Sequence, residues 1–308
     1  MNTMRKFRLI KVTSIGIAII LVVYVGLSIY GAKAAMEIPR LALNNSPASV
    51  GLDYEDVSFT SRDDHIVLRG WYLPSKRNSV IIIVHGGFQN RLDDNVDTLG
   101  FTHDLVKRGY NLLLFDLRGR GESEGKGLAL SDIERDIGGA VDHLKARGYP
   151  LKRIYIIGFC SGAASACIFA SKNSIGALVL DGCFASVLNM VIRQAVLMGI
   201  PEFLVNFLAP GVLLMTKIFY GYDLVNPVDV VADVACPILF IHEEHDELIS
   251  WEETRQLFRV SGNPVNEFWE VSGADHSQSY KRHPVEYIEK VEKFLFTKAE
   301  DTSLESSE

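Results

Sequence analysis

The sequence predicts a doubly wound α/β fold, in which helices cover both faces of a mostly parallel sheet. Four short, nearly continuous apolar runs are typical of strands buried on both sides: Val80–Val84, Leu112–Phe115, Ile154–Ile157 and Ala177–Leu180. Helical stretches separate these runs, at about 97–108, 131–147 and 161–171. Alternation of strands and helices over short connections predicts this architecture.

Further strands are expected on both sides of this series. Val57–Phe59 and Ile66–Tyr72 alternate between apolar and polar residues, which predicts antiparallel strands at one edge. Ile238–Ile241 and Phe268–Val271 continue the parallel series. Helices are expected near 252–260 and 285–296, so the domain should occupy residues 53–298.

The interval from about 184 to 235 contains no buried-strand pattern and is instead helical and very apolar. It follows one parallel strand and precedes the next, so it would lie over the carboxyl edge of the sheet, where ligands bind in open α/β folds. We interpret it as a helical lid or cap. Ordinary core helices are the alternative interpretation.

The N-terminus, residues 1–35, is predicted to be a membrane anchor. Val12–Ala32 is uncharged and, as a helix, would extend about 31 Å, enough to cross a bilayer. Basic residues precede it, which predicts a single-pass protein with a cytoplasmic N-terminus and an extracytoplasmic domain. A cleaved signal peptide ending at Ala32-Lys33-Ala34 is the alternative, but the apolar run is long for one. Residues 36–52 read as a linker.

The net charge of the chain disfavours one class of binding partner, nucleic acid. The 308 residues carry a net charge of −7, and the first 35 contribute five basic residues and no acidic one. The remainder is therefore strongly acidic, which disfavours nucleic-acid binding. Four cysteines are too few for a disulfide scaffold. The acidic, serine-rich stretch 299–308 is predicted to be a disordered tail.

The segment Gly158-Phe-Cys160-Ser-Gly162 lies between a predicted strand and a predicted helix. This Gly-x-Cys-x-Gly pattern predicts a sharp turn that exposes its middle residue, with glycines where strand and helix approach closely. Cys160 is the expected nucleophile, because a helix N-terminus and a nearby histidine favour the thiolate. Ser161 is the alternative nucleophile, but its position instead predicts a backbone N–H for the oxyanion hole.

Candidate partners of the nucleophile follow in chain order. Asp246 comes after the predicted strand Ile238–Ile241, and His276 ends the loop after the next strand. The order nucleophile, acid, base predicts that His276 accepts the thiol proton while Asp246 orients its ring. Asp181, also at a strand end, is the alternative acid.

The turn Val84-His85-Gly86-Gly87 follows a buried strand and predicts the other half of an oxyanion hole, with Gly87 as the donor. His85 is expected to brace the loop. The run His242-Glu-Glu-His245 lacks an evident third ligand and is interpreted as solvated loop residues, so no metal and no cofactor are expected.

From about Tyr54 to Phe296 the chain resembles the α/β-hydrolase superfamily, in particular the membrane-anchored, serine-peptidase-like branch known as the Bem46 type. The segments that carry the resemblance are DYEDVSFTSRDDHIVLRGWYLP, VHGG, DLRGRGES and GADHS. Cys160 departs from this branch, which usually has serine there, and is similar to the cysteine nucleophile of dienelactone hydrolase. The resemblance implies the α/β-hydrolase fold and a triad of Cys160, Asp246 and His276.

The predicted function is hydrolysis of an ester, thioester or lactone through an acyl-cysteine on Cys160. The apolar lid and the anchor favour a small, lipophilic acyl substrate. A peptidase or an acyltransferase would use the same triad, and a catalytically silent binding protein is the alternative from another class. Retention of both Asp246 and His276 favours the catalytic interpretations.

Overall fold

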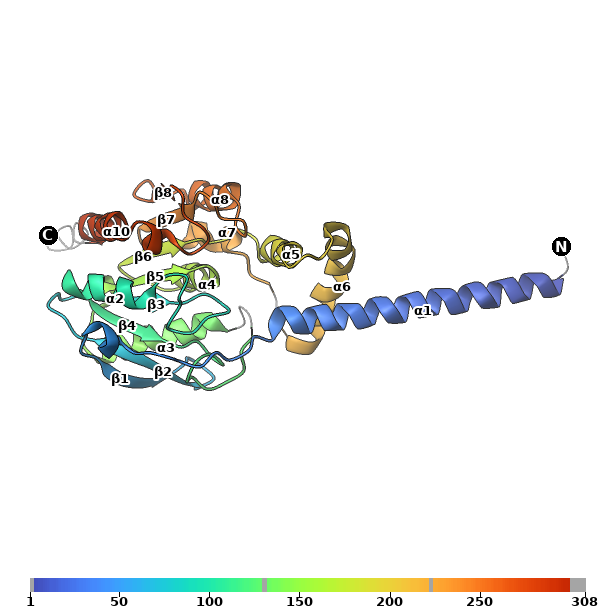
Figure 1. Ribbon diagram of the computed structural model, residues 1–308, viewed down its shortest axis with the longest axis horizontal. Coiled ribbons are helices and arrows are strands. Elements are labelled where there is room, and N and C mark those ends of the chain that lie inside the picture. The colour runs from blue at the N-terminus through green and yellow to red at the C-terminus, as the bar shows by residue number, and fades with distance from the viewer. Residues whose placement is uncertain (1–2, 129–131, 222–223, 300–308) are drawn as a thin grey trace. The chain divides into compact units, whose positions relative to one another are not determined.

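The computed structural model describes residues 3–128, 132–221 and 224–299, and within them the strands form a single eight-stranded sheet (Figure 1). The strand order is β1-β2-β4-β3-β5-β6-β7-β8. β1 and β2 pair antiparallel, β2 pairs antiparallel with β4, and all other pairs are parallel. The bounds are β1 (Glu55–Thr60), β2 (Val67–Leu73), β3 (Val80–Val84), β4 (Asn111–Phe115), β5 (Ile154–Phe159), β6 (Ala177–Asp181), β7 (Ile238–Glu243) and β8 (Glu267–Val271). The predicted, mostly parallel sheet is confirmed.

Helices follow the strands in the order expected of a doubly wound fold. Their bounds are α1 (Thr3–Met36), α2 (Thr98–Lys107), α3 (Ile133–Ala146), α4 (Ser161–Ala170), α5 (Val187–Leu197), α6 (Glu202–Tyr220), α7 (Pro227–Val230), α8 (Trp251–Ser261), α9 (Ser279–Arg282) and α10 (Pro284–Ala299). Short 3-10 turns are η1 (Pro47–Val50), η2 (Leu151–Arg153) and η3 (Val231–Asp233).

The central strands are buried on both faces, as their unbroken apolar sequences predict. All five residues of β3 are buried. Ile81 and Ile83 pack with Phe101 of α2 and Tyr287 of α10 in one core cluster. Because side chains alternate along a strand, Ile82 faces the opposite layer. That layer contains α3, α4, α7 and α8, which contact one another in succession.

The chain divides into two compact units. The larger comprises residues 38–190 and 225–308 and holds the whole sheet. Its first residues, which the sequence predicts as part of a linker, are attached to it: the Arg40 guanidinium donates to the carbonyls of Gly121 and Ser123 at 2.9 and 2.6 Å. The predicted tail, apart from Ala299 at the end of α10, lies outside the described residues.

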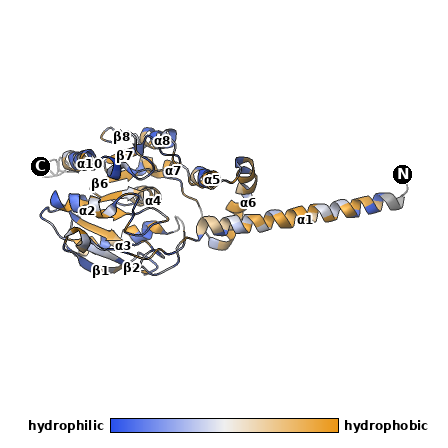
Figure 2. Cartoon of the chain, viewed as in Figure 1, coloured by the Kyte–Doolittle hydropathy of each residue, from blue (hydrophilic) through white to orange (hydrophobic). Residues whose placement is uncertain are grey.

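The smaller unit comprises residues 1–37 and 191–224, and thus contains α1, α6 and most of α5. By length and composition, two of the described helices are apolar enough to cross a membrane, Lys6–Met36 and Glu202–Tyr220 (Figure 2). The interval 184–235 contains α5, α6, α7 and η3, and no strand among its described residues, as predicted.

Candidate active site

A strained turn between β5 and α4 presents Cys160 at its apex. Cys160 has φ 51° and ψ −118°, a conformation that L residues rarely adopt, and its N–H donates to the Asp181 carbonyl at 2.9 Å. A Cβ on Gly158 would lie 2.7 Å from the backbone of Ala163, and one on Gly162 would collide with the His85 carbonyl. The two glycines are therefore required by close backbone packing, as the sequence pattern predicts.

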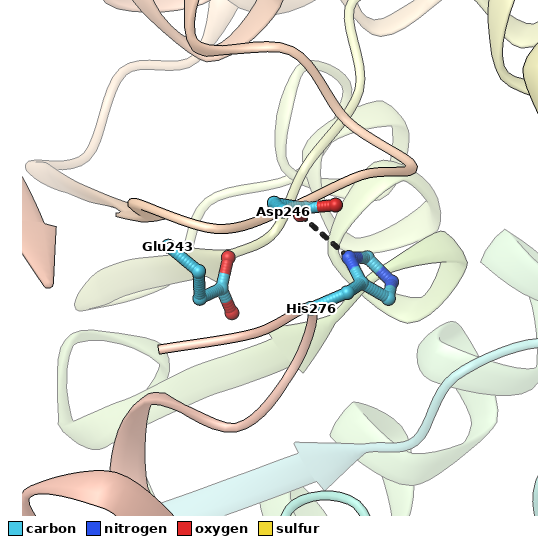
Figure 3. Close-up of side chains that lie close together, drawn as sticks. All are labelled: Glu243, Asp246 and His276. Atoms are coloured by element: carbon cyan, nitrogen blue, oxygen red, sulfur yellow. Dashed lines mark hydrogen bonds and ion pairs between the residues drawn. The ribbon is translucent and has the colours of Figure 1, made fainter. Parts of the chain in front are cut away.

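His276 and Asp246 meet at the carboxyl edge of the sheet. The Nδ1 atom of His276 lies 2.6 Å from Oδ2 of Asp246 (Figure 3). The other oxygen of Asp246 accepts from the N–H groups of Leu248 and Ile249 at 2.8 and 2.7 Å, which fixes the carboxylate plane. Of the two candidate acids, the structure thus pairs Asp246, and not Asp181, with the histidine.

The charges of Cys160 and Asp246 act on the His276 ring. Burial alone would lower the pKa of His276, but a thiolate at Cys160 and the hydrogen-bonded Asp246 hold it well above its ordinary value. Cys160 therefore lies close enough to His276 to act on its charge, while Asp246 is hydrogen-bonded to the ring.

Gly87 and Ser161 lie next to each other beside Cys160. A Cβ on Gly87 would stand 2.6 Å from Oγ of Ser161, and one on Gly86 would stand 3.7 Å from Cβ of Cys160. Within the described residues, neither the Gly87 N–H nor the Ser161 N–H donates to a protein acceptor. Two free N–H groups beside a nucleophile are the arrangement that stabilises an oxyanion.

Two buried side chains hold the turn that carries Gly87. Nε2 of His85 accepts from the Leu117 N–H at 3.2 Å, so Nδ1 carries the proton and donates to the Gly86 carbonyl at 2.7 Å. Burial lowers the pKa of His85 to about 4, which keeps this neutral tautomer. Nε of Arg120 donates to the Gly87 carbonyl at 2.8 Å. His85 therefore braces the loop, as predicted.

A pair of fully buried carboxyl groups adjoins the histidine. Asp181 and Glu243 interact with each other, and Oδ1 of Asp181 and Oε2 of Glu243 have no hydrogen-bond partner among the described residues. Burial and the charge of Asp181 raise the pKa of Glu243 well above its ordinary value. The shift favours the protonated form of Glu243, which could donate to the neighbouring carboxylate. Tyr287 donates to Oδ2 of Asp181 at 2.7 Å, so Asp181 is a structural acid here.

The prediction that residues 242–245 are solvated is wrong for its first half. His242 and Glu243 are the last residues of β7 and are buried, because the strand extends two residues beyond the apolar run; Glu244 and His245 are exposed.

Glu243, Asp246 and His276 each place one donor atom within 4.8 Å of the others, which is a possible metal geometry (Figure 3). A Glu243 carboxyl whose pKa is raised and an Nδ1 already bonded to Asp246 are poor ligands, so the set suits proton transfer better.

Three residues that surround the site were not predicted from the sequence to belong to it: Arg120, Glu243 and Asp93. Asp93 is buried with its Oδ2 3.6 Å from the Cβ position of Gly86, and burial raises its pKa. For Glu243 a signal existed, since it is the second residue after the apolar run Ile238–Ile241 and can still belong to the strand. Arg120 and Asp93 lie in loops, where no periodicity marks a residue as buried.

Comparisons with known proteins agree with this fold. The model of the alpha/beta hydrolase family matches residues 81–224. The esterase Pf2001 of Pyrococcus furiosus superposes with a TM-score of 0.72 at 26% identity, over 85% of this chain and 97% of that one. Among curated proteins, the chain is similar to YqkD of Bacillus subtilis, at 28% identity over 74% of this chain and 75% of that protein. It is also similar to YfhR of Salmonella typhi, at 24% identity over 79% and 84% of the two chains.

The fold, the family-model match and the esterase neighbours together define the class: this chain is an esterase-like hydrolase with the α/β-hydrolase fold. Its eight-stranded sheet and the elbow between β5 and α4 are the features of that fold.

Proposed function

We propose that the protein hydrolyses an ester, thioester or lactone through a covalent acyl intermediate on Cys160. The observation that carries the proposal is the position of Cys160 at a positive-φ apex, close to a histidine whose Nδ1 is held by Asp246. A histidine beside a thiol can accept its proton, and the resulting thiolate can attack an acyl carbon.

The proposed reaction has two stages, acylation of Cys160 and hydrolysis of the thioester. The Cys160 thiolate adds to the carbonyl carbon, and the carbonyl electron pair moves onto oxygen, which the N–H groups of Gly87 and Ser161 stabilise. Collapse breaks the bond to the alkoxide or thiolate leaving group, which takes the proton from His276. Water then attacks the thioester while His276 accepts its proton, and this step releases the acid and regenerates the thiolate.

We extend the proposal to the setting of the enzyme. α1 is proposed as a single-pass anchor with a cytoplasmic N-terminus, supported by its basic start and uncharged run. The segment 184–235 is proposed as the cap, and its apolar composition supports a lipophilic acyl substrate. Membership of the Bem46-type branch rests on the matching segments around Gly87, Arg120 and His276.

The test uses the full chain in detergent with p-nitrophenyl esters of increasing acyl length, comparing wild type with Cys160→Ala and Cys160→Ser. We expect turnover and an acyl adduct in the intact mass, both lost in Cys160→Ala. The chain-length optimum then sizes the acyl site. A wild type that is reduced, inert and free of adduct, beside an active Cys160→Ser, would overturn the proposal and identify a silenced scaffold.

A further inference from the structure

α6 packs directly against the proposed anchor α1, within the smaller unit. Tyr24 of α1 meets Phe207 of α6 edge to face, with ring centroids 5.2 Å apart. Further along both helices, the Tyr220 hydroxyl donates to Glu37 at 3.0 Å. The paired residues follow the same order in the two helices, so α6 accompanies the C-terminal part of α1.

The Tyr24 hydroxyl of α1 forms hydrogen bonds with the backbone of α6 next to its internal proline, Pro210. Pro210 lies inside α6, where a proline ring disturbs the regular hydrogen bonding. The Tyr24 hydroxyl accepts from the Gly211 N–H at 3.1 Å and donates to the Phe207 carbonyl at 3.4 Å. It thus bridges an N–H and a carbonyl of α6 that lie four residues apart. Such a partner matters most where no water reaches the backbone.

Small residues allow the two helices to approach closely. A Cβ on Gly211 would collide with Oγ of Ser28, and one on Gly31 would lie 2.8 Å from Val212. Ser28 and Ala32, four residues apart on α1, are fully buried although the rest of α1 is largely exposed. Small residues at this spacing are typical of helix pairs inside membranes.

The outward side of α6 is apolar. Phe203, Phe207, Leu214 and Ile218 recur at intervals of four and seven residues, which places them on one face, and each is more than half exposed. Exposed apolar area of this extent marks contact with a membrane or another protein. The pairing with α1 decides between the two.

We propose that α6 is embedded in the lipid bilayer beside α1, as the second membrane-contacting element of this chain. The inference rests on the membrane anchor of the proposed function. Tyr24 lies near the middle of the uncharged run Val12–Ala32, so a bilayer-spanning α1 places it deep in the hydrocarbon. Phe207 and Gly211, which contact Tyr24, must lie at the same depth.

The segment between Met190 and Val225 enters and leaves the bilayer on the same side. Met190 and Val225 both belong to the unit that holds the sheet, and α5, with 11 residues, is too short to cross a bilayer. α5 and α6 therefore form a re-entrant pair. The backbone of such a segment has to find hydrogen bonds within the protein, as Gly211 does with Tyr24.

The experiment places one tryptophan at a time on α6, on α1 or on a control helix of the full chain. Each variant is reconstituted in phosphatidylcholine vesicles whose acyl chains carry bromine midway along their length. Leu214→Trp probes α6, and Ile20→Trp probes α1. Val285→Trp, on an exposed position of α10 in the larger unit, is the matched control. Circular dichroism on each variant confirms that it is folded, and the native tryptophans supply the baseline.

We expect bromine to quench the added emission of Leu214→Trp and Ile20→Trp by at least twofold and to leave that of Val285→Trp unchanged. Quenching of Ile20→Trp without quenching of Leu214→Trp would overturn the embedding of α6 and leave the anchor intact. Quenching of neither would remove the anchor itself, and the inference with it. Esterase turnover is not part of the readout, so failure of the catalytic proposal leaves this test unaffected.

Discussion

The amide N–H of Ser277, the residue after His276, donates a 2.9 Å hydrogen bond to Oε1 of Glu243. Ser277 has φ 57°, a left-handed conformation that a serine adopts only when its surroundings hold it there. Glu243 is fully buried at the end of β7, and burial beside Asp181 raises its pKa well above the ordinary value. The loop that carries His276 is therefore held by a buried acid.

Glu243→Gln should preserve this arrangement, because an amide oxygen still accepts from Ser277 and an amide N–H still serves Asp181. We expect activity within a few-fold of wild type. Glu243→Ala should instead lower the free energy of unfolding by about 1–3 kcal/mol for each buried group left unpaired. Thermal melts and kcat/KM of the two variants check this, and a Gln variant as damaged as the Ala variant would show that Glu243 acts as an ionised group.

Asp246→Asn should remove catalysis without unfolding the loop. The Leu248 and Ile249 N–H groups hold the retained Oδ1, so the amide NH2 has to face Nδ1 of His276 and select the wrong tautomer. In serine proteases the equivalent change lowers kcat roughly 10⁴-fold. We expect a loss of similar order here with little change in melting temperature, measured on p-nitrophenyl esters. Retained turnover would point to Asp181 as the acid.

Ser161→Ala separates the two candidate nucleophiles. The Oγ of Ser161 is buried and has no hydrogen-bond partner among the described residues, so its removal should leave stability unchanged or slightly higher. Its N–H, the group proposed for the oxyanion hole, is kept. We expect kcat/KM close to wild type and an acyl adduct that still maps to Cys160 by peptide mass spectrometry. An inactive Ser161→Ala that folds normally would assign the nucleophile to Ser161.

The sign of the pKa shift at His276 gives a prediction for Cys160→Ala. A thiolate stabilises the imidazolium and so raises the pKa of His276. Its removal should therefore lower that pKa, although Asp246 keeps part of the increase. Imidazole proton and nitrogen chemical shifts across a pH series measure the change, with His245, exposed on its loop, as an internal reference. An unchanged titration in Cys160→Ala would mean that the thiol does not ionise in the resting enzyme.

The sequence alone predicts most of the fold, because the strands and the turn at Cys160 depend on local sequence patterns. β3 and β5 are unbroken apolar runs, and the glycines around Cys160 follow from the packing of a single turn. The interaction of Asp181 with Glu243 could not be predicted, since it depends on two strand ends brought together by the sheet. The contact between α6 and α1 could not be predicted for the same reason. The sequence shows that both helices are apolar, but no local pattern indicates that Tyr24 bonds to Gly211.

That link is itself testable with Tyr24→Phe. Loss of the hydroxyl removes its bonds to the Gly211 N–H and the Phe207 carbonyl beside Pro210, while the ring contact with Phe207 remains. Hydrogen bonds between membrane helices contribute about 0.6–2 kcal/mol, so amide exchange at Gly211 should accelerate severalfold. Hydrogen–deuterium exchange of the full chain in nanodiscs measures it, with Tyr30→Phe, an exposed tyrosine on the same helix, as the matched control. Equal exchange in the two variants would show that the Tyr24 hydroxyl does not hold α6 to α1.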